Sequence, residues 1–422
     1  MAFCLTSSPK PRRPLTVLIL LVAVLVIPAA MVPAAAAPAH AVAPEATKLR
    51  PSSAGPLLIG HRGAAGVAPE NTVAAFRAGR AAGVDFIETD VQLSADGVPF
   101  LFHDNTPART TNVEEVYPGR EKDPITSFTW KELRALEVGS SFGRRFTGAR
   151  IPHLDDLARI ANRRTGVYLE IKSPKNSPGI EALVARKLSG HPAWKRLVDA
   201  GKVHVLGFDA SSNRRFAALA PRIDLQQLVG TVPNEQTLAD WSGFADSVGT
   251  NYRTLTPGAV DRVHAAGLGL GVYTANSPEA ITIAVDLGVD IVTGDFPQQS
   301  VRLQAGRPPF PRARGLQISE AVNDPPGDDV AFDAGEHVVI RNASDHAIDA
   351  SGVLLRDAAN NTLRVGAGYR IPPGGELRVH TGPGTNTATA YFNGGSASIL
   401  NKGGDSVALW DKWGRLQDVF AN

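Results

Sequence analysis

The sequence predicts a (β/α)8 TIM barrel, an α/β fold, followed by an all-β sandwich. Between Leu57 and Leu303, short apolar or β-branched runs alternate with helical patterns, which indicates repeated βα units and a parallel sheet. About 250 residues with about eight such strands is the size of this barrel. A doubly wound open sheet is the alternative, but no glycine-rich dinucleotide fingerprint follows any predicted strand. From Leu316 onward, short alternating runs separated by Asn-, Gly- and Pro-rich turns predict the sandwich.

The predicted strands and helices of the first segment alternate along the chain. The expected strands are Leu57–Gly60, Val84–Val91, Val98–Phe102, Gly166–Ile171, Val203–Phe208, Ile223–Val229, Ala245–Gly249, Leu268–Tyr273 and Asp290–Thr293. The expected helices are Thr72–Ala82, Leu154–Asn162, Ile180–Leu188, Asn213–Ala220, Ala259–Ala266 and Pro278–Leu287. Asn71 precedes the first helix and is expected to cap it.

Residues 1–41 have the layout of a cleaved signal peptide. Basic residues between positions 10 and 13 precede an apolar run, Leu15–Ile27, which is followed by a proline and small residues up to Ala41. The run is shorter than the roughly 18 to 20 residues that cross a bilayer, so a permanent anchor is the weaker interpretation. The adjacent Arg12 and Arg13 leave twin-arginine export open beside general secretion. We therefore expect an exported protein, secreted or associated with the cell wall, with no membrane span in its mature chain.

The rest of the chain is expected to divide into a barrel (57–303), a Pro- and Arg-rich linker (304–315) and a sandwich (316–422). Cys4, Met1 and Met31 are the only sulfur-containing residues, so the mature protein has no disulfide, cysteine nucleophile or zinc–thiolate site. The small basic excess, 43 Lys and Arg against 41 Asp and Glu, disappears once the three basic residues of the leader are removed. Charge therefore gives no reason to expect a nucleic-acid partner.

Polar side chains gather where the predicted barrel strands end. They comprise two imidazoles, three carboxylates, a guanidinium and an ammonium, namely His61, Arg62, Glu88, Asp90, His103, Glu170 and Lys172. The carboxyl ends of the strands form the active face of a (β/α)8 barrel, so these side chains should converge. Each residue alone could be structural, as a histidine satisfied in a turn or an acid paired with Arg62 or Lys172. The gathering of all seven favours a catalytic site.

Three of these residues predict a site for a divalent cation. Glu88 and Asp90 are two residues apart on one strand and therefore point to the same face. Two carboxylates this close repel each other unless a cation lies between them, and Glu170 adds a third from another strand. An all-oxygen site suits a hard cation rather than zinc. We expect Ca²⁺, which is available outside cells, with Mg²⁺ as the alternative.

The remaining residues suit phosphoryl transfer. Arg62, Lys172 and the cation can neutralise charge on phosphate oxygens. One of His61 and His103 can remove a proton from an attacking hydroxyl while the other protonates the leaving alcohol oxygen. A glycosidase on the same fold needs two carboxylates and has no use for a histidine pair.

The same residues lie in motifs that resemble the glycerophosphodiester phosphodiesterase family. The motifs run in family order over Leu57 to Leu303 and are GHRG (60–63), PENT (69–72), ETD (88–90), HD (103–104), RTT (109–111), IPHLDDL (151–157), LEIK (169–172), VYTAN (272–276) and GVDIVTGDFP (288–297). One departure is Tyr273, where the family usually has tryptophan, which keeps an aromatic ring and adds a hydroxyl.

The resemblance implies a TIM barrel and a chemical mechanism. His61 and His103 would be the acid–base pair. Glu88, Asp90 and Glu170 would bind the divalent cation. Arg62 and Lys172 would lie near the phosphate. A hydroxyl of the glycerol moiety would attack phosphorus and expel the head-group alcohol, and hydrolysis of the cyclic phosphate would yield sn-glycerol 3-phosphate.

The carboxyl-terminal segment resembles the lamin-tail domain, an immunoglobulin-like sandwich that is attached to secreted bacterial enzymes. The supporting motifs are NDPPGDD (323–329), EHVVIRN (336–342), SGVLLRD (351–357), IPPGGELRV (371–379) and GDSVALWDKWG (404–414). Attachment through residues 316–422 to a wall polymer, a protein or the substrate is left open by these motifs.

Two other functions remain as alternatives. A phospholipase D-like activity on lysophospholipids could use the same barrel, but the polar segment from Asn105 to Trp130 favours a small soluble or polymeric glycerophosphodiester. A non-catalytic cell-surface binding protein would have no need to keep all seven site residues.

Overall fold

The computed structural model describes residues 55–421 of the chain. The predicted leader, residues 1–41, lies outside the described residues. Among the helices within 55–421, none combines the length and the apolar character needed to pass through a bilayer.

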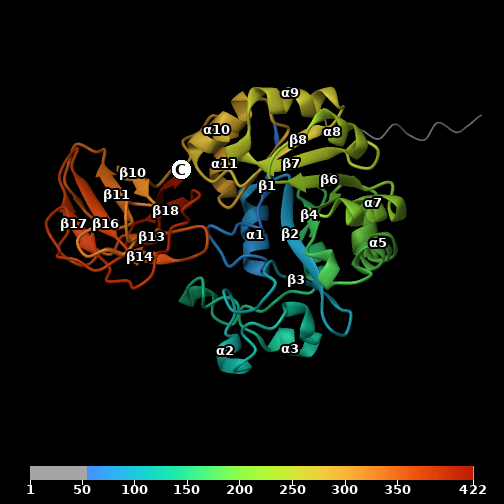
Figure 1. The fold of residues 1–422 in the computed structure, drawn as a ribbon, viewed down its shortest axis with the longest axis horizontal. Coiled ribbons are helices and arrows are strands. Elements are labelled where there is room, and N and C mark those ends of the chain that lie inside the picture. Colours follow the sequence, from blue (N-terminus) through green and yellow to red (C-terminus); the bar gives the residue numbers. More distant parts are fainter. Residues whose placement is uncertain (1–54, 422) are drawn as a thin grey trace, which may run out of the picture. The chain divides into compact units, whose positions relative to one another are not determined.

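Eight parallel strands close into a barrel (Figure 1). They are β1 (Leu57–Gly60), β2 (Phe86–Leu93), β4 (Gly166–Ile171), β5 (Val203–Gly207), β6 (Asp224–Val229), β7 (Ser247–Asn251), β8 (Gly269–Tyr273) and β9 (Ile291–Gly294). β1 pairs with β9 on one side and with β2 on the other, which completes the ring. The predicted TIM barrel is therefore confirmed, and this closure excludes the doubly wound open sheet.

Helices follow the parallel strands and surround the barrel (Figure 1). They are α1 (Val73–Ala82), α4 (Leu154–Ile160), α5 (Ile180–Gly190), α6 (Pro192–Val198), α7 (Ala210–Leu219), α8 (Glu235–Trp241), α9 (Pro257–Ala265), α10 (Pro278–Asp286) and α11 (Pro297–Gln304). Two short helices, α2 (Val113–Val116) and α3 (Trp130–Ala135), lie in the long insertion between β2 and β4. The insertion has its own apolar core, built around Phe100, Phe128 and Leu133.

One predicted barrel strand is instead half of a hairpin. β3 (Pro99–Leu101) runs antiparallel to β2, with Leu101 paired to Val91. β2 continues to Leu93, beyond the last position, Val91, at which it pairs with β4. The hairpin therefore extends past the rim of the ring, and β3 leads the chain back toward it. This return places His103 at the carboxyl ends of the parallel strands although it does not follow a barrel strand.

Apolar side chains fill the barrel beneath the predicted site. Ile59, Phe86, Tyr168, Leu206, Leu228 and Ile291 form one buried cluster. Successive side chains of a strand alternate between its faces, so Phe86 shares a face with Glu88, and Tyr168 shares a face with Glu170. The acidic side chains are therefore the next inward-facing positions above an apolar floor.

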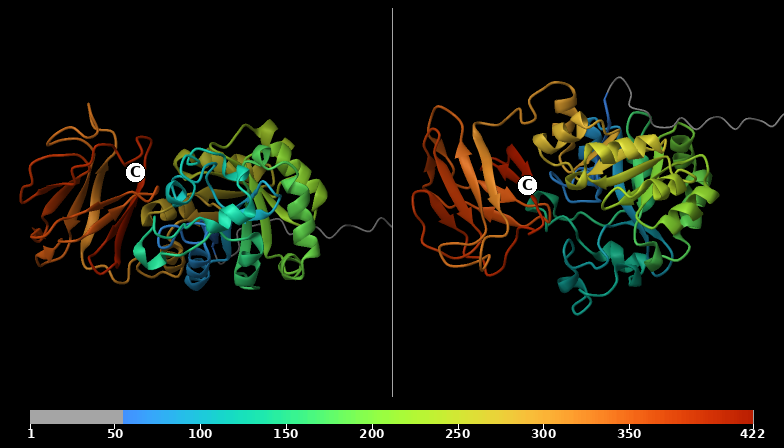
Figure 2. Two further views of the ribbon diagram at one scale, coloured as in Figure 1. Left: turned by 90° about the horizontal axis from the view of Figure 1, so that it is seen from below. Right: turned by 45° about the horizontal axis from the view of Figure 1, so that its top comes forward.

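Residues after α11 form two four-stranded sheets, which confirms the predicted all-β segment (Figure 2). One sheet has the order β10 (Leu316–Val322), β11 (His337–Asn342), β16 (Glu376–His380), β17 (Ala390–Phe392), and the other β14 (Thr362–Arg364), β13 (Leu354–Arg356), β18 (Ser406–Trp410), β19 (Leu416–Ala421). A small pair, β12 (Ile348–Asp349) and β15 (Arg370–Ile371), lies beside them. Ile340 and Leu377 of the first sheet share a buried core with Leu355 and Leu409 of the second.

Candidate active site

The carboxyl ends of the barrel strands surround a cavity of about 200 Å³. Six of the seven predicted site residues line it, namely His61, Arg62, Glu88, His103, Glu170 and Lys172. Asp90, the seventh, is buried and contacts Lys172, whose Nζ lies 3.4 Å from Asp90 Oδ1. The structure thus brings together every side chain that the sequence analysis selected.

Three buried carboxylates form an acidic cluster, defined here as Glu88, Asp90 and Glu170. One oxygen from each lies within 4.8 Å of one oxygen of the other two. Burial and the charges of Asp90 and Glu170 raise the pKa of Glu88 well above its usual value. Burial and the charge of Asp90 raise the pKa of Glu170 to about 7. The cluster therefore has more negative charge than its surroundings compensate, which is the condition that a divalent cation relieves.

Lys172 compensates part of this charge. Its Nζ lies 3.1 Å from Glu170 Oε1, as well as close to Asp90. Burial alone would raise the pKa of Asp90, but the neighbouring His103 imidazole and the positive charges of Lys172 and Arg62 lower it below its usual value. Among residues 55–421, the only basic side-chain atom within 4.0 Å of a Glu88 oxygen is His61 Nε2, at 4.0 Å. Pairing with basic residues therefore does not account for the whole cluster.

The turn after β1 positions Arg62 against the cluster. The backbone N–H of Arg62 donates to Glu88 Oε2 (2.6 Å), and its Nη1 donates to Glu70 Oε1 (2.9 Å). The next residue, Gly63, has a φ of +92°, and a Cβ there would lie 2.5 Å from the carbonyl carbon of Ala75 in α1. Only glycine lets this turn pack directly on the helix.

An aspartate orients His61. His61 follows β1, and its Nδ1 lies 2.6 Å from Asp295 Oδ1 at the end of β9. A carboxylate on Nδ1 holds the proton there, so Nε2 is the nitrogen left for chemistry. Burial alone would raise the pKa of Asp295, but the charge and hydrogen bond of His61 and a hydrogen bond from Asn276 lower it.

His103 has an equivalent partner on the other side of the cavity. Its Nδ1 lies 2.7 Å from Asp104 Oδ1. Arg109 donates to both Asp104 (Nε to Oδ2, 2.6 Å) and Glu70 (Nη2 to Oε1, 2.7 Å). It therefore links the aspartate that contacts His103 to Glu70 of the PENT motif. Burial lowers the pKa of His103 despite the nearby negative charge of Asp90. The lowered pKa favours the neutral imidazole.

These supporting residues lie in the motifs PENT, HD, RTT, VYTAN and GVDIVTGDFP, but their chemical roles could not be predicted from the sequence. The prediction that Asn71 caps the first helix is wrong, because Thr72 caps α1 through its Oγ1, which accepts from the N–H of Ala75 (3.3 Å). Asn71 instead has a φ of +54° and donates from Nδ2 to Asp90 Oδ2 (2.8 Å). The signal available in the sequence was the PENT motif, in which Glu70 precedes Asn71. An asparagine that only capped a helix would not require an acid before it.

Tyr273 forms an aromatic wall of the cavity together with Phe208. Their ring centroids are 5.9 Å apart in an edge-to-face arrangement. The hydroxyl by which Tyr273 differs from the tryptophan usual in the family donates to the carbonyl oxygen of Val229 at the end of β6 (2.9 Å). It is therefore paired with the barrel backbone.

The fold and the cavity together define a barrel enzyme with its site at the carboxyl ends of the parallel strands. The sequence model of the Glycerophosphoryl diester phosphodiesterase family matches residues 61–299, more than half of the chain, and the chain belongs to this family. The Lamin Tail Domain model matches residues 310–421. The family match confirms the resemblance found in the barrel motifs, and the second match confirms the resemblance of the sandwich.

Known proteins agree with this assignment. The chain is 32% identical to a glycerophosphodiester phosphodiesterase of Caldanaerobacter subterraneus over 249 residues, which span 58% of this chain and 97% of the relative. It is 27% identical to a glycerophosphodiester phosphodiesterase of Bacillus subtilis over 262 residues, 59% of this chain and 87% of the relative. A crystal structure of a Silicibacter pomeroyi protein assigned to the glycerophosphoryl diester phosphodiesterases has a TM-score of 0.51 at 28% identity, with 62% of this chain and 98% of that chain covered. These similarities concern the barrel.

Proposed function

We propose that this protein is an exported, cation-dependent phosphodiesterase that cleaves glycerophosphodiesters to sn-glycerol 3-phosphate and an alcohol. The observation that carries the proposal is the common cavity of His61 and His103, which Glu88 and Glu170 of the acidic cluster also line. Two imidazoles beside clustered carboxylates and basic side chains suit phosphoryl transfer better than glycoside hydrolysis, which uses carboxylates alone.

The acidic cluster would hold the divalent cation. Its carboxylate oxygens suit Ca²⁺ or Mg²⁺, with Ca²⁺ our first expectation and Mg²⁺ the alternative. When bound, the cation would supply positive charge that stabilises the phosphate oxygens as negative charge develops on them. The raised pKa values of Glu88 and Glu170 support this assignment, because they mark a site short of positive charge.

The basic residues and the imidazoles would perform the remaining steps. Lys172 and Arg62 line the cavity and can contact phosphate oxygens. With Nδ1 of each histidine held by an aspartate, the two Nε2 atoms can exchange protons with substrate. One would take the proton of a glycerol hydroxyl that attacks phosphorus, and the other would protonate the departing alcohol. The same pair, with roles exchanged, would add water to the cyclic phosphate.

A substrate panel tests this proposal. Purified mature protein would receive glycerophosphocholine, glycerophosphoglycerol or a lysophospholipid, each with Ca²⁺ or Mg²⁺, and both glycerol 3-phosphate and its acylated form would be measured. We expect release of glycerol 3-phosphate from the two soluble diesters. Product from the lysophospholipid alone would support the phospholipase D-like alternative. No release with either cation would contradict the proposal.

Export is proposed from residues 1–41 alone. Their basic segment, apolar run and small residues before position 42 are typical of a leader that is removed. Mass spectrometry of the protein from culture medium and cell wall should find a chain that begins near residue 42. An intact amino terminus on a protein confined to the cytosol would contradict export.

A further inference from the structure

Ser406 belongs to the β-sandwich but lies at the back of the barrel's active site. Asn276 of the VYTAN motif donates from Nδ2 to Asp295 Oδ2 (2.5 Å) and to Ser406 Oγ (2.9 Å). Asp295 in turn contacts Nδ1 of His61 (2.6 Å). A continuous chain of hydrogen bonds therefore runs from the sandwich to an imidazole of the proposed acid–base pair.

The orientation of the Asn276 amide is fixed by its neighbours. The backbone N–H of Asp295 donates to Asn276 Oδ1 (2.8 Å), so the amide oxygen faces that backbone and the nitrogen faces the carboxylate. The two N–H groups of this nitrogen then serve Asp295 and Ser406. Asn276, Asp295 and Ser406 are all buried, where hydrogen bonds are stronger than at the exposed surface.

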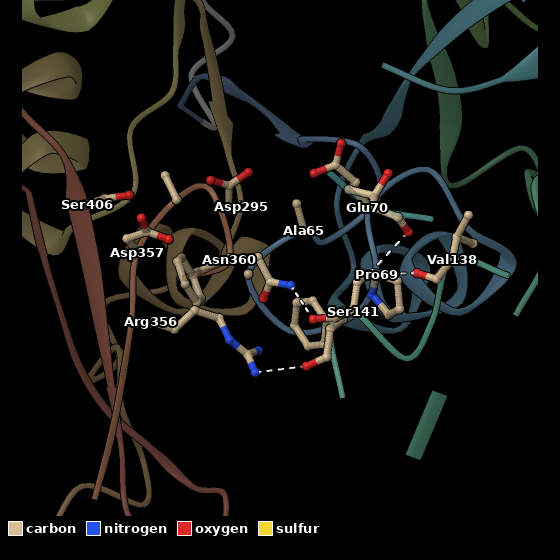
Figure 3. A pocket seen from close by; sticks show the side chains of 15 residues that line it. Ala65, Pro69, Glu70, Val138, Ser141, Asp295, Arg356, Asp357, Asn360 and Ser406 are labelled. Carbon is tan, nitrogen blue, oxygen red and sulfur yellow. Dashed lines mark hydrogen bonds between the residues drawn. The ribbon is translucent and has the colours of Figure 1, made fainter. Parts of the chain in front are cut away.

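A second observation places the same strand of the sandwich against this part of the barrel. Phe296, next to Asp295, belongs to an apolar cluster with Ala408 and Trp410 of β18. Ser406, Ala408 and Trp410 share one face of β18 because side chains alternate along a strand. Figure 3 shows Ser406 and Asp295 on the wall of one small cavity, which the sandwich residues Arg356 and Asn360 also line.

We propose that Ser406 is a positioning residue for catalysis, which acts through Asn276 and Asp295 to hold the His61 imidazole in place. The sandwich is then a part of the catalytic unit as well as an appended domain. This inference rests on the proposed acid–base role of His61. A serine that only joined the two domains would not need to share a donor with the aspartate of the imidazole.

The test is a double-mutant cycle in the full-length mature protein, with kcat and KM measured for glycerol 3-phosphate release. Ser406→Ala should lower kcat about 3- to 10-fold, the range for one net hydrogen bond, and leave KM nearly unchanged. Asn276→Ala should lower kcat further. The double variant should match Asn276→Ala, because the effect of Ser406 passes through the amide.

Asn360→Gly is the matched control. It removes another hydrogen bond between sandwich and barrel, from Asn360 Nδ2 to the Ser141 carbonyl oxygen (2.8 Å), which does not lead to Asp295. Asn360 has a φ of +77°, which glycine adopts freely, so the hydrogen bond is removed with the side chain and the backbone is not strained. This variant should keep the wild-type kcat.

Three outcomes would overturn the inference. They are an unchanged kcat in Ser406→Ala, an equal loss in Asn360→Gly, and independent, multiplicative losses in the double variant. Each of these would leave the proposed function intact, since the wild type would still release glycerol 3-phosphate. A wild type without that activity would overturn the proposed function and this inference with it.

Discussion

On both sides of the cavity an aspartate contacts Nδ1 of the imidazole, but different residues support the two aspartates. His61 is bonded to Asp295, a buried carboxylate that Asn276 supports, and His103 is bonded to Asp104, which Arg109 supports. Arg109 is about one-third exposed, whereas Asn276 is buried. Amide support inside the protein is insulated from solvent, whereas an ionic network at the surface can be screened by salt and partly replaced by water. The two sides should therefore differ in how much activity depends on them.

Removal of either imidazole should have the largest effect. His61→Ala and His103→Ala should each lower kcat about 1,000-fold, because proton transfer by a positioned side chain contributes in that range. Glycerol 3-phosphate release, together with circular dichroism to confirm folding, measures this. His346→Ala, on the exposed surface of the sandwich, is the control and should keep full activity. A folded variant of either cavity histidine within tenfold of wild type would refute that residue's role.

Substitution of the two supporting aspartates should lower kcat by different amounts on the two sides of the cavity. Asp295→Asn should lower kcat about 10- to 100-fold, the range found for residues that orient a functional imidazole. Asp104→Asn should cost less, because Arg109 and water remain nearby. Parallel measurement of kcat and KM for the two variants checks the order. A larger loss for Asp104→Asn would break the proposed distinction between buried and exposed support.

The smallest expected effect is on the free energy of unfolding and concerns Glu70, which lies on the His103 side of the cavity. Burial alone would raise the pKa of Glu70, but the charge of Arg62 and the hydrogen bond from Arg109 lower it from 4.5 to about 2. A lowered carboxyl pKa contributes stability that is present above the unfolded value and lost as the pH falls through the folded one. Glu70→Gln should therefore lower the free energy of unfolding by about 1–3 kcal/mol at pH 7.

This difference from wild type should shrink as the pH falls from 4.5 toward 2. Urea unfolding of both proteins at pH 7, 4 and 3 measures it. A difference that stayed constant over this range would show that Glu70 acts by packing rather than by charge.

Most of the barrel could be predicted because its strands are apolar and its helices periodic. Of the helices around the barrel, α6, α8 and α11 were missed, as were the short α2 and α3 of the insertion. Helix α8 buries only Leu238, and the buried residues of α11 are Pro297, Gln299 and Ser300, which show no apolar periodicity. The direction of β3 could not be predicted, because it depends on how far β2 extends beyond its pairing with β4. Local pattern identifies a strand but does not give its partner.

The candidate site, like the fold, could be predicted only in part. Side chains such as Glu88 and Lys172 could be predicted because they follow or end barrel strands, whose carboxyl ends converge. Asp295 could not be assigned to His61, since 234 residues separate them, and Ser406 is 130 residues from Asn276 in a different domain. The motifs marked the barrel residues as important, but only the folded chain shows which group each one supports.

We propose that the acidic cluster needs a divalent cation for the two imidazoles to act. The most direct measurement is glycerol 3-phosphate release from glycerophosphocholine by the wild type before and after chelation, and again after addition of Ca²⁺ or Mg²⁺. We predict loss of activity on chelation, its return with one of these cations, and no response to thiol reagents or reductants. The only cysteine of the sequence, Cys4, lies in the segment that we propose is removed. Activity that survives complete chelation would contradict the account.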